Sequence, residues 1–226
     1  GIQHSIKNML NVMKGGSYMV KLGLAKDNKD MLVEGWEMVR EGIEDMTQMS
    51  MSMLDFARTR KLKLKEVDLG DLVAKIHGIS RAKFTDSGVR LSVEAFEGLP
   101  HTVCDADGIR SVVMDLISNA LDACSWKQYT PPESPEVILR VLPGTLPGHI
   151  EIQVEDNGDG MPEEVKKRVF MPFFSTKEKK GTGMGLAVVG RIVESHEGSV
   201  YVESEPGQGT TFRVLLPIQG PSLREE

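Results

Sequence analysis

The sequence is poor in cysteine, and this limits the kinds of site it can form. Only Cys104 and Cys124 occur in 226 residues, too few for a disulfide framework or for a zinc site of spaced thiolates. The five histidines are scattered without the spacing of metal ligands, so catalytic zinc has no support. Both thiols are therefore predicted to be reduced and buried, in a protein of the cytoplasm.

Long apolar runs and basic blocks are also missing. No apolar stretch approaches the roughly 18 residues of a membrane-spanning helix, and no signal peptide is present. A net charge of -6 without a sustained Lys/Arg block argues against a nucleic-acid-binding surface. We therefore expect contacts with neither nucleic acid nor membrane. Because the chain begins at Gly1 within a helical pattern, we expect a piece of a longer protein, whose membrane anchoring this reasoning leaves open.

The first quarter of the chain has the periodicity of packed helices. Apolar positions recur at steps of three and four before and after the polar break "AKDNKD", which indicates an antiparallel helical hairpin. Two helices alone bury little surface, so we expect a four-helix bundle formed by two chains, a homodimer. This first domain is predicted to span residues 1–64. Its seam positions are Ile6, Leu10, Met13, Ser17, Val20, Leu24, Leu32, Trp36, Val39, Ile43, Met46 and Met53.

From residue 65 to 226 the pattern changes to alternating helices and strands. Asp68 can cap a helix that ends near Asp86, and Asp105 or Asp107 can open another. "VRLSVEAF" alternates like a strand, "EVILRVLP" and "HIEIQVED" predict a hairpin, and "SVYVES" and "TTFRVLLP" predict closing strands. The fold class expected for this second domain is an α/β sandwich, with helices covering one face of a mixed sheet.

Two segments of the second domain carry polar groups placed to contact a ligand. "EDNGDGMP" follows a strand, and Gly158 and Gly160 after Asp156 would let the backbone approach a planar ligand. Taken alone, this loop is equally compatible with a common tight turn or a weak mimic of a calcium loop. In "DLISNALDA", Asp115, Asn119 and Asp122 share one face of a helix whose other residues are apolar. Burying such a row without a ligand or metal is costly.

Two further segments lie closer to the C-terminus. "KKGTGMGLAVVGRIV" is a glycine-rich loop that runs into a helix, and backbone amides at a helix N-terminus favour anions such as phosphate. Its spacing is that of neither a Rossmann nor a P-loop motif. "FMPFFSTK" places three phenylalanines, expected to be core anchors, beside Lys177. That lysine can meet a phosphate or remain solvated.

Together these segments resemble sensor histidine kinases of two-component systems. "DLISNALDA", "EDNGDGMP", "FMPFFSTK" and "GTGMGLAVV" look like the N, first glycine, F and second glycine boxes, in family order, and "HSIKN" looks like the phosphoacceptor box. The resemblance covers residues 4–217. It implies a dimerisation and phosphotransfer hairpin followed by a catalytic domain of the GHKL (Bergerat) ATP-binding fold.

The resemblance also implies roles for individual residues. Asp156 would accept the adenine amino group of ATP, Asn119 would ligate Mg²⁺ with Asp115 beside it, and Thr210 would lie near the base. The stretch from Ser175 to Met184 would be a short ATP lid. The full set implied for nucleotide binding is Asn119, Asp122, Asp156, Gly158, Gly160, Lys177, Gly181, Thr182, Gly183, Gly185, Leu186 and Thr210.

His4 would be the phosphorylated residue, with a response-regulator receiver domain as the partner that takes the phosphoryl group. The helical spacing sets His4, Asn8 and Asn11 on a polar face. Ser5 stands where the family commonly has an acidic residue, and serine is a poor base, so slow autophosphorylation is expected. Asn8 matches the position that orients water for dephosphorylation of the regulator, which adds phosphatase activity to the expectations.

Two other functions remain open at this stage. Asp115 stands where histidine kinases commonly carry Asn, whereas ATPases of this fold use an acidic general base, so a GHKL ATPase or a protein serine kinase is one alternative. A nucleotide-binding scaffold without turnover is the other.

Overall fold

The computed structural model describes residues 2–57, 61–177 and 183–221, without the side chains of residues 2–5, 48, 52 and 54–57. The chain separates into two compact units, which are described one at a time. One holds the first two helices together with Met171–Ala187, and the other holds all strands and the remaining helices, apart from the first three residues of the last helix. The predicted boundary between residues 64 and 65 stays a prediction.

The first unit contains the predicted hairpin, α1 (Ile2–Lys26) packed against α2 (Lys29–Ala57). The two backbones approach closely at glycines. A Cβ on Gly16 would lie 2.6 Å from the carbonyl oxygen of Gly35, and a Cβ on Gly35 would lie 2.7 Å from that of Gly16. Gly23 and Gly42 are buried one heptad further along their helices. The contact line therefore runs through glycines, which pattern analysis of apolar residues does not detect.

Several large residues of the predicted seam are not buried between α1 and α2. Leu10, Leu24, Trp36 and Ile43 are 42%, 70%, 60% and 48% exposed. They repeat at heptad intervals on their helices. Because glycines form the contact between α1 and α2, these side chains lie elsewhere on the helix surface.

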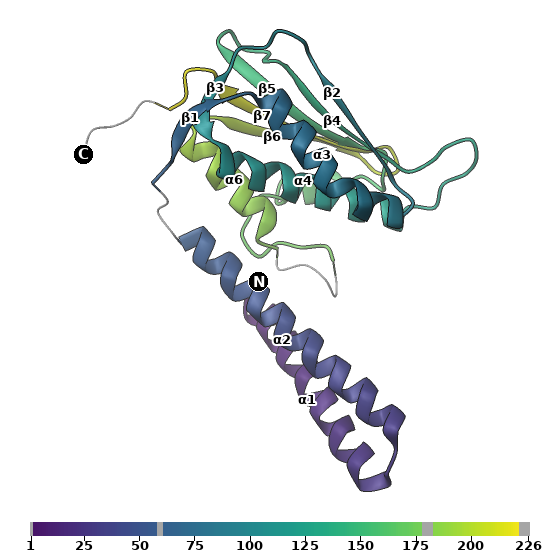
Figure 1. The fold of residues 1–226 in the computed structure, drawn as a ribbon. Helices are drawn as coiled ribbons and strands as arrows, with labels where there is room; N and C mark the ends of the chain where they lie inside the picture. Colours follow the sequence, from purple (N-terminus) through teal and green to yellow (C-terminus); the bar gives the residue numbers. More distant parts are fainter. Residues whose placement is uncertain (1, 58–60, 178–182, 222–226) are drawn as a thin grey trace. The chain divides into compact units, whose positions relative to one another are not determined.

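The second unit is built on a mixed sheet with the strand order β2-β4-β5-β7-β6. Strands β2 and β4 are parallel and the other neighbours are antiparallel, with β4 and β5 forming the predicted hairpin. Helices α3 (Leu69–Asp86), α4 (Ala106–Trp126) and α6 (Gly185–Ser195) cover one face (Figure 1), which confirms the predicted α/β sandwich. The strands are β2 (Arg90–Ala95), β4 (Glu136–Pro143), β5 (His149–Asp156), β6 (Ser199–Glu205) and β7 (Gly209–Pro217).

Helix starts follow the capping residues seen in the sequence. Asp68 caps α3 (Leu69–Asp86) by accepting a 3.0 Å hydrogen bond from the backbone N–H of Asp71. Asp105, rather than the alternative Asp107, caps α4 (Ala106–Trp126), accepting from the N–H groups of Asp107 and Gly108. Three small elements were not predicted, namely β1 (Leu64–Val67), which pairs with β3 (Thr102–Asp105), and helix α5 (Glu163–Lys166).

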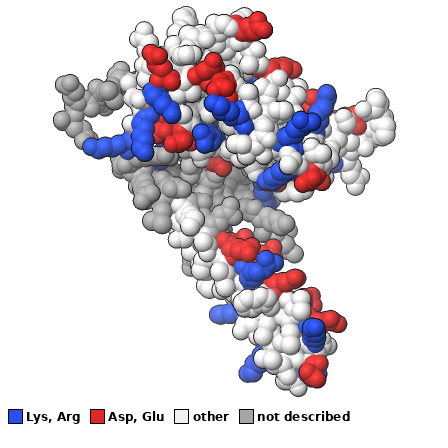
Figure 2. Space-filling model, in the orientation of Figure 1, with Lys and Arg blue, Asp and Glu red and all other residues white. Residues whose placement is uncertain are grey.

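The core lies between these helices and the inner face of the sheet. The apolar residues of the DLISNALDA segment, Leu116, Ile117, Ala120 and Leu121, are all buried, as predicted. Cys104 and Cys124 are buried and free. Among the described residues, none of the helices is both long and apolar enough to cross a membrane. Acidic and basic side chains are mixed over the visible surface of this unit (Figure 2).

Candidate active site

A buried carboxylate at the end of the central strand is the centre of the site. Asp156 closes β5 opposite Thr210 of β7, and its Oδ1 accepts a 2.9 Å hydrogen bond from the N–H of Gly158. Burial raises the pKa of Asp156 to about 6, while hydrogen bonds from the backbone of Gly158 and Thr210 oppose the rise. Near neutral pH the group is an oriented anionic acceptor with little access to water.

Glycines let two turns meet at this carboxylate. Gly160 has a φ of +66°, and a Cβ there would collide with the carbonyl oxygen of Glu205. Gly209 has a φ of +100°, and a Cβ there would collide with the carbonyl oxygen of Asp156. The turn after β5 and the turn between β6 and β7 therefore touch backbone to backbone, which only glycine permits.

Ser204 belongs to the site and was missed in the sequence. Its buried hydroxyl oxygen accepts a 2.8 Å hydrogen bond from the N–H of Met161 and lies 2.9 Å from both the Gly209 carbonyl oxygen and Thr210 Oγ1. It holds the Thr210 hydroxyl beside the turn that follows Asp156. A serine near the end of a strand carries no distinguishing signal in one sequence.

Asn157 was also missed, although it lies inside the quoted EDNGDGMP motif. Its Oδ1 accepts a 2.9 Å hydrogen bond from the N–H of Glu136, and its Nδ2 donates a 2.8 Å bond to the carbonyl oxygen of Ser134. These two partners define the orientation of the amide. The side chain therefore ties the turn after β5 to the start of β4.

The polar row on α4 runs toward this turn. Asp115, Asn119 and Asp122 are half-buried, and burial raises the pKa of Asp115 to about 6. A Cβ on Gly158 would lie 2.6 Å from the carbonyl carbon of Ala123, so the last turns of α4 pack against the loop after Asp156. Two of the four predicted boxes are thus brought together within one unit.

The donor set on α4 suits Mg²⁺ that arrives with a nucleotide. The Asn119 amide and the Asp115 carboxylate are hard oxygen donors one turn apart. Among the residues that the structure describes, no group of three or more His, Cys, Asp or Glu gathers as a metal site. Mg²⁺ bound largely by phosphates and waters requires only one or two protein ligands, and these residues fit that mode.

The predicted lid has a defined base. The N–H of Phe173 donates a 2.8 Å hydrogen bond to the carbonyl oxygen of Gly183, and Gly183 has a φ of +65°. Lys177 is half-buried, and its N–H donates to Ser175 Oγ at 3.1 Å. Gly181 and Thr182 lie outside the described residues. Gly185 and Leu186 open helix α6 (Gly185–Ser195). The nucleotide-binding roles predicted for this stretch remain predictions.

The predicted phosphoacceptor lies in the first turns of α1. His4 and Ser5 are helical, but their side chains lie outside the described residues. Asn8 follows one turn later and is exposed. The roles predicted for these three residues are untested by the structure.

Comparison with known proteins supports the likeness drawn from the motifs. Residues 104–220 match the family of histidine kinase-, DNA gyrase B-, and HSP90-like ATPases. The sensor histidine kinase ZraS of Klebsiella oxytoca is 30% identical over 227 residues, covering 100% of this chain and 46% of ZraS. The sensory histidine kinase/phosphatase NtrB of Rhodobacter capsulatus is 29% identical over 98% of this chain and 62% of NtrB. The chain spans less than half the length of ZraS.

Solved structures share the fold. Full-length ShkA in complex with AMPPNP superposes with a TM-score of 0.70 at 20% identity, over 97% of this chain and 46% of that one. The histidine kinase ThkA in complex with the response regulator protein TrrA gives 0.76 at 19% identity, over 96% and 60%. The chain therefore belongs to the histidine kinase-, DNA gyrase B-, and HSP90-like ATPase family, and the predicted resemblance to sensor histidine kinases is confirmed.

Proposed function

We propose that this chain is the kinase core of a sensor histidine kinase, which phosphorylates itself from ATP on His4 and passes the phosphoryl group to a response-regulator aspartate. The observation that carries the proposal is the buried, oriented carboxylate of Asp156, because an anionic acceptor at the end of β5 matches the exocyclic amino group of adenine. Gly158 and Gly160 let the turn that follows this carboxylate pack directly against the backbone of Ala123 and Glu205.

The relatives extend this proposal to partners. ShkA is described with AMPPNP, an ATP analogue, and ThkA with a response regulator. By that likeness, we assign ATP as the substrate and a receiver domain as the acceptor. NtrB is described as kinase and phosphatase, which supports a phosphatase role in which Asn8 orients water on the phosphorylated regulator.

The chemistry proposed for His4 is an in-line displacement. A neutral ring nitrogen of His4 forms a bond to the γ-phosphorus, the bond from that phosphorus to the β,γ-bridging oxygen breaks, and ADP leaves. Asn119, with Asp115 beside it, would hold Mg²⁺. The bound ion would neutralise part of the phosphate charge. Ser5 is a weak base, so removal of the ring proton is slow, and a low autophosphorylation rate follows.

The exposed apolar residues of the hairpin support a homodimer. Leu10 and Leu24 on α1 and Trp36 and Ile43 on α2 are large, apolar and exposed. Burial of such side chains against a second copy is the usual reason for their presence on a helix surface. The proposed dimer is a four-helix bundle.

The test of the kinase proposal is incubation with Mg²⁺ and γ-labelled ATP, comparing the chain with His4→Gln. The expected label on the protein is acid-labile and alkali-stable, and it is lost in the variant. An equal label on both proteins, or an acid-stable label, would rule out His4 as the acceptor.

A second function is favoured by Asp115. Burial raises the pKa of this carboxyl to about 6, close to the range in which a general base for water works best. ATP hydrolysis without phosphorylation of His4 is therefore the alternative. Phosphate release that is equal in the parent and in His4→Gln, but lost in Asp115→Asn, would establish it. Nucleotide binding with no turnover would instead indicate a scaffold.

A further inference from the structure

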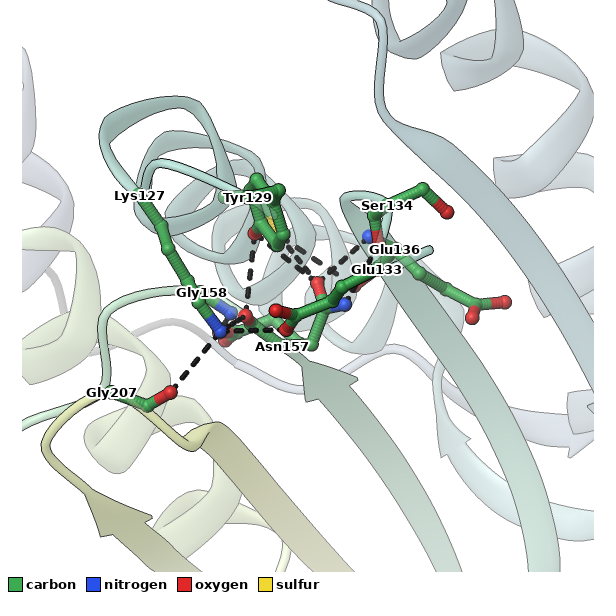
Figure 3. Close-up of polar contacts among 10 residues, drawn as sticks. Lys127, Tyr129, Glu133, Ser134, Glu136, Asn157, Gly158 and Gly207 are labelled. Carbon is green, nitrogen blue, oxygen red and sulfur yellow. Dashed lines mark hydrogen bonds and ion pairs between the residues drawn. The ribbon is translucent and has the colours of Figure 1, made fainter. Parts of the chain in front are cut away.

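A lysine outside all the recognised motifs holds the turn that contains Asp156. Lys127 directly follows α4, and its side chain is only 14% exposed. The ammonium nitrogen donates to three oxygens, Glu133 Oε1 at 2.8 Å, the Asn157 carbonyl at 2.8 Å and the Gly207 carbonyl at 3.1 Å (Figure 3). An ammonium group has three N–H donors, so all three are used.

The two carbonyl groups belong to the two turns on either side of Asp156. Asn157 follows Asp156 directly, and Gly207 lies in the turn between β6 and β7. These turns also contact each other, because the N–H of Gly207 donates a 2.6 Å hydrogen bond to the Asp159 carbonyl oxygen. Lys127 therefore joins the turn that carries the acceptor carboxylate to the turn that leads into Thr210.

Tyr129 strengthens this contact from the same loop. Its hydroxyl lies 3.3 Å from the Asn157 carbonyl oxygen and 3.2 Å from Asn157 Oδ1, and its ring centroid lies 5.0 Å from the Lys127 ammonium nitrogen. A cation over a tyrosine ring is attracted by the π-electrons. The backbone and side chain of Asn157 are thus held by the segment from Lys127 to Glu136.

We propose that Lys127 is a positioning residue for adenine recognition, which acts by holding the Asp156–Gly160 turn so that the Asp156 carboxylate faces the exocyclic amino group of the base. The inference rests on the proposed function, namely ATP at the Asp156 site. A lysine that touches neither base nor phosphate would then set the preference for adenine. The charge of Lys127 also favours the ionised form of Asp156, lowering its pKa against the larger effect of burial.

Loss of a purely structural lysine would lower the affinity for all nucleotides alike. Loss of a positioning residue would lower the affinity mainly for nucleotides that carry the correct base. Inosine triphosphate separates the two roles, because it carries a carbonyl oxygen where adenine has the amino group. The Asp156 carboxylate accepts from the amine and repels the oxygen, so a correctly held turn prefers ATP. If the turn shifts, this preference falls while the phosphate contacts persist.

The experiment measures the dissociation constants of Mg²⁺-ATP and Mg²⁺-ITP by titration calorimetry on the whole chain. In Lys127→Met we expect ATP affinity to fall about tenfold and the preference for ATP over ITP to shrink by at least about threefold. Lys127→Arg, which keeps the charge and the donors, should restore part of the preference. Lys75→Met is the matched control, since Lys75 is exposed on α3 and its ammonium group pairs with Asp71 one turn away.

The outcomes separate this inference from the proposed function. Failure of the parent chain to bind ATP would overturn both. Binding of ATP by the parent, with an unchanged ATP-to-ITP ratio in Lys127→Met, would overturn the role of Lys127 alone. If Lys127→Met does not fold, Tyr129→Phe removes the hydroxyl that contacts Asn157 and Cys124 and keeps the ring beside Lys127. A smaller loss of preference in that variant supports the inference, and an unchanged preference overturns it.

Discussion

At the scale of single residues, the negative charge of Asp156 that the site uses also lowers the stability of the folded chain. The Asp156 carboxyl has a pKa of about 6 in the folded chain against 3.8 for the free group, mainly because of burial. Between these values the folded state binds a proton that the unfolded state does not bind. The contribution of Asp156 to stability therefore rises as the pH falls through about 6, and ionisation above that pH costs stability.

Asp156→Asn should be more stable than the parent above about pH 6, by roughly 2 kcal/mol, because the amide keeps the acceptor for Gly158 without a buried charge. The difference should vanish near about pH 4. Asp115 titrates in a similar range in both proteins, so its effect cancels. Urea unfolding at about pH 8 and about pH 4 measures the difference at both ends of this range. If Asp156→Asn and the parent differ in stability by the same amount at both pH values, the raised pKa of Asp156 is contradicted.

At the scale of elements, two neighbouring glycines of α1 have different surroundings. A Cβ on Gly16 would lie 2.6 Å from the Gly35 carbonyl oxygen and 2.8 Å from Met38 Cβ, whereas a Cβ on Gly15 would meet only Met38 Cε at 3.6 Å. Both positions are helical. Their substitution therefore separates helix propensity from the packing of α1 on α2.

Gly16→Ala should destabilise the hairpin by roughly 1–3 kcal/mol, because the helices must move apart to admit the methyl group. Gly15→Ala, the matched control, should stabilise it by up to about 1 kcal/mol through helix propensity alone. Chemical unfolding followed by circular dichroism shows whether each substitution lowers or raises the free energy of unfolding. Stabilisation by both substitutions would mean that the close approach of Gly16 and Gly35 is wrong.

At the scale of the whole molecule, the exposed apolar residues of the hairpin support the proposed homodimer. We expect Ile43→Glu to shift the chain from dimer to monomer, because the substitution places a charge in the proposed bundle interface. Sedimentation equilibrium at several concentrations measures the change. Ile79→Glu, at a position 68% exposed on α3 of the other unit, is the control and should leave the dimer intact. A monomeric parent chain would contradict the proposal.

The sequence predicted those features that depend on local chemistry. Asp68 and Asp105 cap helices because a short acceptor side chain satisfies free N–H groups within its own turn. Glycines after a strand marked the turn at Asp156, and the order of the motifs identified the family. The paired strands β1 and β3 escaped prediction because each has four residues, and such short runs carry too little pattern.

The sequence by itself determined the fold class and the family, because these follow from local periodicity and motif order. Only the tertiary structure decided that glycines form the contact between α1 and α2, and that Ser204, Asn157 and Lys127 support Asp156. Their roles depend on hydrogen bonds between segments far apart in the chain. Such partners leave no local pattern, because any serine, asparagine or lysine could occupy the same position in a loop.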